Sequence, residues 1–332
     1  MTNISIIAEQ IYSFSQEYAF YGSMIIMIGG LLSNICLMLT LTGVRIFRQN
    51  QCAFYLTSEC FANIGILSII LTSRMLTRIG KVDPVNLSEV WCKIRSWLIN
   101  VFCVTSLGTV CSAACDQYLS TNHRYSLRQR STLILAHQLV FTVVLFATIH
   151  SIPLLVYSSI DPTAGCQISN RILIRYYTVF YYPFVTTSFP IIVVSSSSFL
   201  AYRNVRRLVR RHIPVIRRRL DRQLTAMVLT RSICLIALGL PYIVYSLYAL
   251  NSTIRKDDEL SLAISQLFEV VTLSLFYTNY SINFYVFLFI SAQFRRQVKY
   301  YFFKRWFRLA TQVPHRCRNK IAPQVIAVID LD

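Results

Sequence analysis

Residues 133–157 read LILAHQLVFTVVLFATIHSIPLLVY, a run of mostly apolar side chains without any Asp, Glu, Lys or Arg. A helix rises 1.5 Å per residue, so about 20 residues cross the roughly 30 Å of hydrocarbon in a bilayer. Helices in the core of a soluble protein are usually shorter and carry a polar face. This stretch therefore predicts a membrane-spanning helix.

Six further apolar stretches flank this one on both sides. In total, we expect spans at residues 20–44, 53–77, 89–122, 133–157, 175–203, 222–250 and 260–290. The chain is 55% hydrophobic and only 14% charged, which is too apolar for an ordinary soluble domain. We expect an all-α membrane protein, a seven-transmembrane helix bundle at residues 20–290, with no second globular domain.

The loops between the predicted spans differ in charge. Loops 45–52, 123–132 and 204–221 and the tail after residue 290 hold most of the arginines, whereas the opposite loops carry few basic residues. Basic loops face the cytoplasm, so the N-terminus is expected outside, the C-terminus inside, and the chain in the plasma membrane. The net charge of +19 would also suit binding of nucleic acid. The basic residues gather at helix ends, however, so we expect membrane lipid as the partner and no nucleic acid.

Three further segments complete the expected organisation. Residues 1–19 are expected to form a short extracellular N-terminus without a signal peptide, because no basic start precedes an apolar run. Residues 291–309 alternate basic and aromatic side chains, which favours an amphipathic eighth helix in the membrane interface; the alternative is a disordered basic tail. Residues 310–332 are expected to be a cytoplasmic tail. The glycosylation candidates Asn3, Asn86 and Asn251 all fall on the predicted outer side.

Several polar side chains lie inside the predicted spans, namely Asn34, Glu59, Asn63, Arg231 and Asn279. Ionisable groups are costly in hydrocarbon, so such a group is expected to be functional or paired. We hypothesise that Glu59 and Arg231 face each other across the bundle. The alternative is a protonated Glu59 and an Arg231 that reaches towards the headgroups. The asparagines are expected to hydrogen-bond between helices.

Cysteines and prolines add two local expectations. Seven of the 10 cysteines lie in apolar runs, whereas Cys92 and Cys166 lie in or beside predicted outer loops and are the pair that could form a disulfide. Pro153, Pro190 and Pro241 lie inside spans, where each removes a backbone hydrogen bond and favours a kink.

Over residues 20–309 the sequence resembles the rhodopsin-like family of G-protein-coupled receptors. The resemblance rests on the order of Asn34, Trp91-Cys92 with Cys166, Asp116-Gln117-Tyr118, Pro190, Pro241, Asn283-Phe284-Tyr285-Val286-Phe287 and Phe294-Arg295. It implies a Cys92–Cys166 disulfide and an activation switch that comprises Asp116, Gln117, Tyr118, Asp221, Pro241, Asn283 and Phe287. An extracellular ligand and a heterotrimeric G protein are the implied partners.

The chain also departs from the family pattern at the switch. Gln117 stands where the family has an arginine, and Asp221 keeps the place of that arginine's acidic partner. Asn63 replaces the sodium-binding aspartate, and Phe284 replaces the seventh-helix proline. Phe287 replaces a tyrosine, and Gly239 stands at the place of the toggle tryptophan. These losses put ordinary activation in doubt and leave a non-signalling receptor, a scavenger or a dimer partner, as the alternative.

The ligand is expected to meet an aromatic wall in the outer half of the bundle. The cavity candidates are Ile99, Tyr181, Tyr245, Tyr248, Phe268 and Glu269. Ile99 stands where amine receptors carry an aspartate, so a biogenic amine is disfavoured. The aromatic wall suits an aromatic or amidated peptide whose basic group meets Glu269. The alternative for each tyrosine is a place at the lipid interface.

Other classes of function are disfavoured by the same residues. A transporter would require an inverted repeat or two matched broken helices. The five histidines form no HExxH, and the chain has no P-loop and no nucleophile–base constellation. We therefore expect no enzyme, no metal site and no cofactor.

Overall fold

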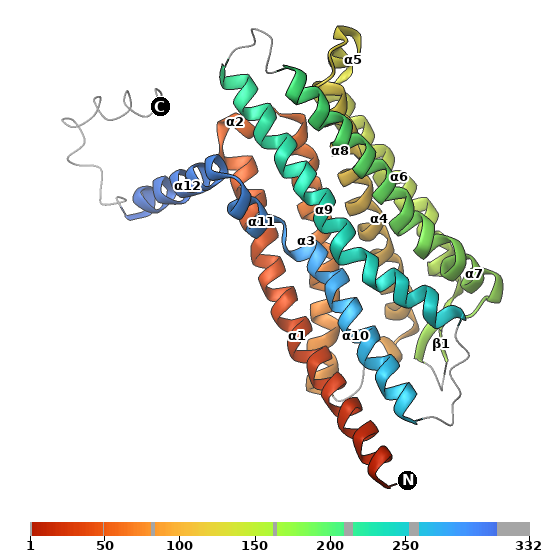
Figure 1. Ribbon diagram of the computed structural model, residues 1–332. Coiled ribbons are helices and arrows are strands. Elements are labelled where there is room, and N and C mark those ends of the chain that lie inside the picture. The colour runs from red at the N-terminus through yellow and green to blue at the C-terminus, as the bar shows by residue number, and fades with distance from the viewer. Residues whose placement is uncertain are drawn as a thin grey trace.

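The computed structural model describes residues 2–48, 50–80, 84–161, 165–208, 215–251 and 259–310, and Figure 1 shows them as a bundle of long helices. Within these residues, seven helical segments are long and apolar enough to cross a membrane. They are α1 (Thr2–Gly43), α3 (Gln51–Gly80), α4 (Glu89–Ser120), α6 (Leu133–Tyr157), the fifth-span segment α7 (Arg171–Arg175), η2 (Tyr176–Ser188) and α8 (Phe189–Leu208), then α9 (Val215–Asn251) and α10 (Glu259–Ser281). The predicted seven-helix fold is confirmed.

Short elements close the two ends of the bundle (Figure 1). One end carries η1 (Pro84–Asn86) and the antiparallel hairpin of β1 (Ser158–Asp161) and β2 (Gly165–Ile168). We call it the disulfide end, because Cys92 and Cys166 are joined there. The other end carries α2 (Arg45–Arg48), α5 (Tyr125–Arg130), α11 (Asn283–Ile290) and α12 (Ala292–Ala310), and we call it the α12 end.

Helix α4 occupies the centre of the bundle. It packs against α3, α6, α8 and α9. Helix α1 packs against both α3 and α10. Gly30 makes the close approach of α1 to α10 possible, because a Cβ atom there would lie 2.6 Å from Cβ of Ser281. An apolar cluster at the α12 end includes Leu37, Leu56, Val228, Phe287 and Phe294 and ties α1, α3, α9, α11 and α12 together.

The first helix begins at Thr2 and not near residue 20, as the sequence led us to expect. Residues 2–19 contain no Gly or Pro that would stop a helix. Hydropathy indicates which residues lie in the bilayer, but it does not indicate where the helix ends. With 42 residues, α1 is about 63 Å long at 1.5 Å per residue, roughly twice the hydrocarbon thickness. Figure 1 shows its N-terminal turns projecting past the neighbouring helices at the disulfide end.

Four other features differ from the sequence-based expectation. The stretch 260–290 is two helices, α10 and α11, which meet at Ile282. The fifth span contains the π-helical segment η2, with Pro183 inside it, where the missing amide of proline favours a wider turn. The expected loop 123–132 contains α5, and the hairpin of β1 and β2 was not expected. Gly165, at a φ of 74°, starts β2 in a left-handed conformation that glycine adopts freely.

Candidate functional site

A buried ion pair lies between α3 and α9. The Nε atom of Arg231 donates to Oε1 of Glu59 at 2.8 Å, and each side chain is 1% exposed. Arg231 is six residues, about 9 Å, from the start of the apolar part of α9 at Thr225. The two residues that we hypothesised to face each other therefore form a direct contact in the apolar interior.

Two asparagines complete the site around this ion pair. Nη1 of Arg231 donates to Oδ1 of Asn279 on α10 at 2.5 Å. Nδ2 of Asn283 on α11 donates to Oε1 of Glu59 at 2.9 Å. The polar cluster of Glu59, Arg231, Asn279 and Asn283 thus joins α3, α9, α10 and α11.

The carboxylate and guanidinium do not form the two-pronged contact of which they are capable. Oε1 of Glu59 accepts two hydrogen bonds, from Arg231 and Asn283. Nη2 of Arg231, Nδ2 of Asn279 and Oδ1 of Asn283 are buried without a hydrogen-bond partner. The polar cluster therefore keeps two donors and one acceptor that make no hydrogen bond.

A second, neutral chain of polar side chains lies beside the polar cluster. Oγ of Ser106 on α4 donates to Oδ1 of Asn63 at 2.6 Å, and Nδ2 of Asn63 donates to Oδ1 of Asn34 at 3.2 Å. Nδ2 of Asn34 donates to the carbonyl of Tyr280 at 2.8 Å. This chain joins α4, α3, α1 and α10 through amides and a hydroxyl.

The break between α10 and α11 depends on the same part of α1. The amide of Phe284 donates to Oγ of Ser33 at 3.3 Å, while the Tyr280 carbonyl, four residues earlier, accepts from Asn34. Ser33 and Asn34 thus take the donor and the acceptor that would otherwise bond to each other within a continuous helix. The helix is interrupted without a proline at 284.

The switch residues lie at the α12 end. Asp116 is 2% exposed and accepts a hydrogen bond of 2.8 Å from Oγ of Ser131. Oε1 of Gln117, 4% exposed, accepts from Oγ1 of Thr225 on α9 at 3.2 Å. The side chain of Asp221 lies outside the described residues, so the expected Gln117–Asp221 contact is not described. Tyr118 is half-buried, and Pro241 lies inside α9 between Arg231 and the disulfide end.

Phe287 belongs to the apolar packing at the α12 end. Its ring is 1% exposed and lies 6.2 Å from that of Phe294, the fully buried residue in the first turns of α12. The ring of Phe47 lies 6.4 Å from Phe294 on another side. Phe287 therefore anchors the start of α12 by ring packing.

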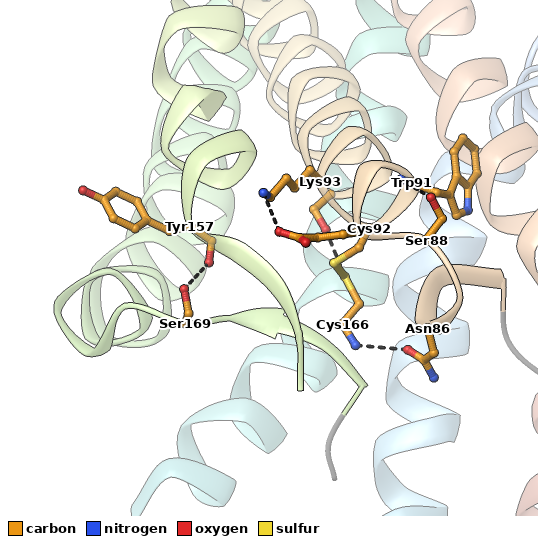
Figure 2. The surroundings of a disulfide bond; sticks show 10 residues. Asn86, Ser88, Trp91, Cys92, Lys93, Tyr157, Cys166 and Ser169 are labelled. Carbon is orange, nitrogen blue, oxygen red and sulfur yellow. Dashed lines mark hydrogen bonds and ion pairs between the residues drawn. A yellow bond between two sulfur atoms is a disulfide. The ribbon is translucent and has the colours of Figure 1, made fainter. Parts of the chain in front are cut away.

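The disulfide joins Cys92 on α4 to Cys166 on β2, with the two Cα atoms 5.7 Å apart. Figure 2 shows that Asn86 points at the same strand, and its Oδ1 accepts from the amide of Cys166 at 3.0 Å. Ser88 caps the start of α4 by accepting from the amide of Trp91. The hairpin is thus fixed to α4 by the disulfide and to η1 by the hydrogen bond of Asn86.

The six cavity candidates do not share one environment. Tyr181 is 1% exposed, and its hydroxyl donates to Oδ1 of Asn100. Tyr245 donates to the carbonyl of Ser265 at 2.9 Å and so links α9 to α10. Ile99 packs against an apolar cluster that includes Ile66. Tyr248, Phe268 and Glu269 are exposed.

The polar residues of these contacts that the sequence analysis did not single out include Ser33, Asn100, Ser131 and Thr225. Asn100 could have been found, because it is an amide within a span. The cost of burying a polar group applies to it as to the other asparagines. Its Nδ2 donates to Oγ of Ser151 at 2.7 Å, which joins α4 to α6. Ser33, Ser131 and Thr225 carry hydroxyls that bond within their own helix as readily, so their sequence gives no such signal.

The glycosylation candidates differ in how far the structure describes them. Asn86 is exposed at the disulfide end. The side chains of Asn3 and Asn251 lie outside the described residues.

A bundle of seven membrane-spanning helices, with a disulfide-fixed hairpin at one end and polar ties through its interior, defines the class of seven-helix membrane receptors. The family of seven-transmembrane receptors of the rhodopsin type matches residues 33–285, and the chain belongs to this family. It is a multi-pass membrane receptor and not an enzyme. A search of curated proteins finds no match to this chain.

Proposed function

We propose that this receptor binds a ligand at the disulfide end and activates a heterotrimeric G protein at the α12 end. The disulfide end and the N-terminus are outside and the α12 end is cytoplasmic, in keeping with the arginines concentrated in the loops at the α12 end. The plasma membrane is the proposed location. Ligand binding shifts an equilibrium in which the α12 end of α9 moves away from α4.

A peptide with a basic group is the proposed ligand, and Glu269 carries this proposal. Its side chain is exposed on α10, and neither of the two ion pairs among the described residues uses it. It lies near enough to Tyr242 and Tyr245 on α9 to act on both electrostatically. A carboxylate beside tyrosines, within a span, suits a cationic ligand group that also stacks on aromatic rings.

Lipid is the second proposed partner, and α12 is its site. Tyr300, Phe302 and Phe303 are 52%, 36% and 68% exposed, on a helix that also carries Arg295, Arg296 and Lys299. In a helix that lies in the membrane interface, aromatic side chains enter the acyl boundary and basic side chains face the lipid headgroups. We propose residues 291–309, most of which belong to α12, as the interfacial segment between the bundle and the tail.

Cells that express the receptor and a G-protein dissociation sensor test the proposal with a panel of amidated peptides, with and without a basic residue. We expect a basic peptide to activate the wild type. Glu269→Gln should weaken its potency about tenfold or more, because the bound peptide would bury its charge against the carboxylate. Glu259→Gln is the matched control, because Glu259 is an exposed acid in the first turn of the same helix. An equal loss in both variants would contradict the role of Glu269.

A non-signalling receptor is the second candidate function. It is favoured by the neutral Gln117–Thr225 bond in place of a charged lock, and by Gly239, where a Cβ atom would meet nothing within 4 Å. In the same cells, Gln117→Arg distinguishes the two functions. A gain in basal or peptide-driven G-protein activity supports the signalling receptor, while silence of both chains across the panel supports the non-signalling one.

A further inference from the structure

The α12-end half of α9 is tied to its neighbours by several contacts, of which one is ionic among the described side chains. Thr225 bonds to Gln117 on α4, Gln223 bonds to Gln297 on α12 at 3.2 Å, and Ser232 bonds to Ser198 on α8 at 2.9 Å. These are contacts between neutral groups. Arg231, through Glu59, gives the same half of the helix its charged tie to α3.

The apolar surroundings of this ion pair make the separation of its two charges costly. Leu56 and Cys60 on α3, and Val228 and Leu235 on α9, lie within one turn of the two charges and belong to the buried apolar cluster. Water is excluded there, so separating the charges is far more costly than at the surface. The exposed pair of Lys93 and Glu89, 2.6 Å apart, is screened by solvent and has no such effect.

The ion pair also lies at the right place along α9. Pro241 interrupts the hydrogen-bond ladder ten residues beyond Arg231, towards the disulfide end. The charged tie is therefore between this point of weakness and the α12 end of the helix. Any outward movement of that end about Pro241 draws Arg231 away from Glu59.

We propose that the Glu59–Arg231 ion pair holds α9 against α3 in the resting receptor, and that its separation is the step that frees α9. Asn279 and Asn283 share in this restraint, because they bond the guanidinium and the carboxylate and belong to α10 and α11. When the charges separate, Nη2 of Arg231, Nδ2 of Asn279 and Oδ1 of Asn283 are open to entering water. The inference rests on the proposed movement of α9 but on no ligand.

The rate of thiol alkylation at residue 225 tests the restraint. Thr225 is 5% exposed and faces α4, so a Thr225→Cys thiol reacts with a small maleimide only when α9 leaves α4. The rate is measured in membranes, with the same chain lacking Thr225→Cys subtracted to remove the native cysteines. The decisive variant is Glu59→Gln with Arg231→Gln, which removes both charges and leaves neither one uncompensated.

We expect the doubly neutral receptor to fold and residue 225 to react about fivefold faster or more, since the resting state loses its charged tie. The single variants Glu59→Gln and Arg231→Gln show whether the effect of removing one charge on the alkylation rate depends on the presence of the other charge. Glu89→Gln, at the exposed pair, is the control and leaves the rate unchanged.

Two results would overturn the inference. One is a properly folded double variant whose residue 225 reacts less than about fivefold faster than in the wild type. The other is a double variant that fails to fold, since the ion pair would then serve assembly and not restraint. No G protein or peptide enters this assay, so it can succeed where the signalling test fails, and the reverse.

Discussion

Asn100 shows how one residue can join three segments of the bundle. It accepts from Tyr181 on η2 and donates to Ser151 on α6, and both of its partners are buried. Removing the amide leaves the Tyr181 hydroxyl without an acceptor in the interior, whereas removing that hydroxyl leaves Asn100 bonded to Ser151. The two changes should therefore differ in cost.

We predict that Asn100→Ala lowers the free energy of unfolding by about 1–3 kcal/mol, the cost of an unsatisfied buried polar group. Tyr181→Phe should cost less, about 0.6 kcal/mol, as is typical of single hydrogen bonds between membrane helices. Thermal unfolding in detergent, followed by labelling of the buried thiols of Cys52 and Cys60, measures both. Thr72→Ala is the control, because that exposed hydroxyl bonds only to the Ser68 carbonyl of its own helix. The reverse order of the two losses would refute this account.

At the scale of the element, the break between α10 and α11 is held open from outside. Proline would impose such a break covalently, but Ser33 and Asn34 on α1 do it by hydrogen bonds to Phe284 and Tyr280. Position 284 is the second residue of α11, where proline is tolerated because its missing amide is not needed by the helix.

We predict that Ser33→Ala destabilises the receptor by about 1–2 kcal/mol, because the buried amide of Phe284 loses its acceptor. In a Phe284→Pro background the same change should cost almost nothing, since no amide remains to be satisfied. A cycle of the two single variants and the double variant, compared by thermal unfolding, isolates this coupling from the lost ring packing of Phe284. Equal costs in both backgrounds would show that Ser33 does not hold the break.

The elements that hydropathy defines could be predicted from the sequence, and those that tertiary contacts define could not. The expected span 133–157 agrees with α6 (Leu133–Tyr157), whose first turn is capped by Thr132. The start of α1 was missed, because a helix can continue beyond the bilayer where no residue stops it. The break at Ile282 depends on a bond between Ser33 and Phe284, 251 residues apart, and no local pattern reveals it.

At the scale of the whole molecule, the proposed orientation makes Asn86 accessible to glycosylation in the lumen. Asn86 is exposed, and its Oδ1 takes the hydrogen bond from Cys166. We predict that the wild-type receptor from cells carries a glycan that slows its migration on a gel, and that glycosidase removes this shift. Asn86→Gln should abolish the shift contributed by Asn86. Ser88→Thr keeps the sequon Asn86-Leu87-Ser88 as Asn-Leu-Thr and serves as the control, which should retain the glycan. Two results together would show the opposite orientation. They are the absence of glycan at Asn86 and the other sequons, and antibody access to a C-terminal tag on intact cells.

The depth of Arg231 has a consequence for how the chain is made. An unpaired arginine within a span opposes insertion into the membrane, by up to about 2.5–3.5 kcal/mol at the centre of the helix. Glu59 precedes it by 172 residues, so at 5–20 residues per second the ribosome delivers α3 roughly 10–30 s before α9. The carboxylate is then already in the bilayer when the arginine arrives, and the newborn sixth span acquires its counter-ion from an older one.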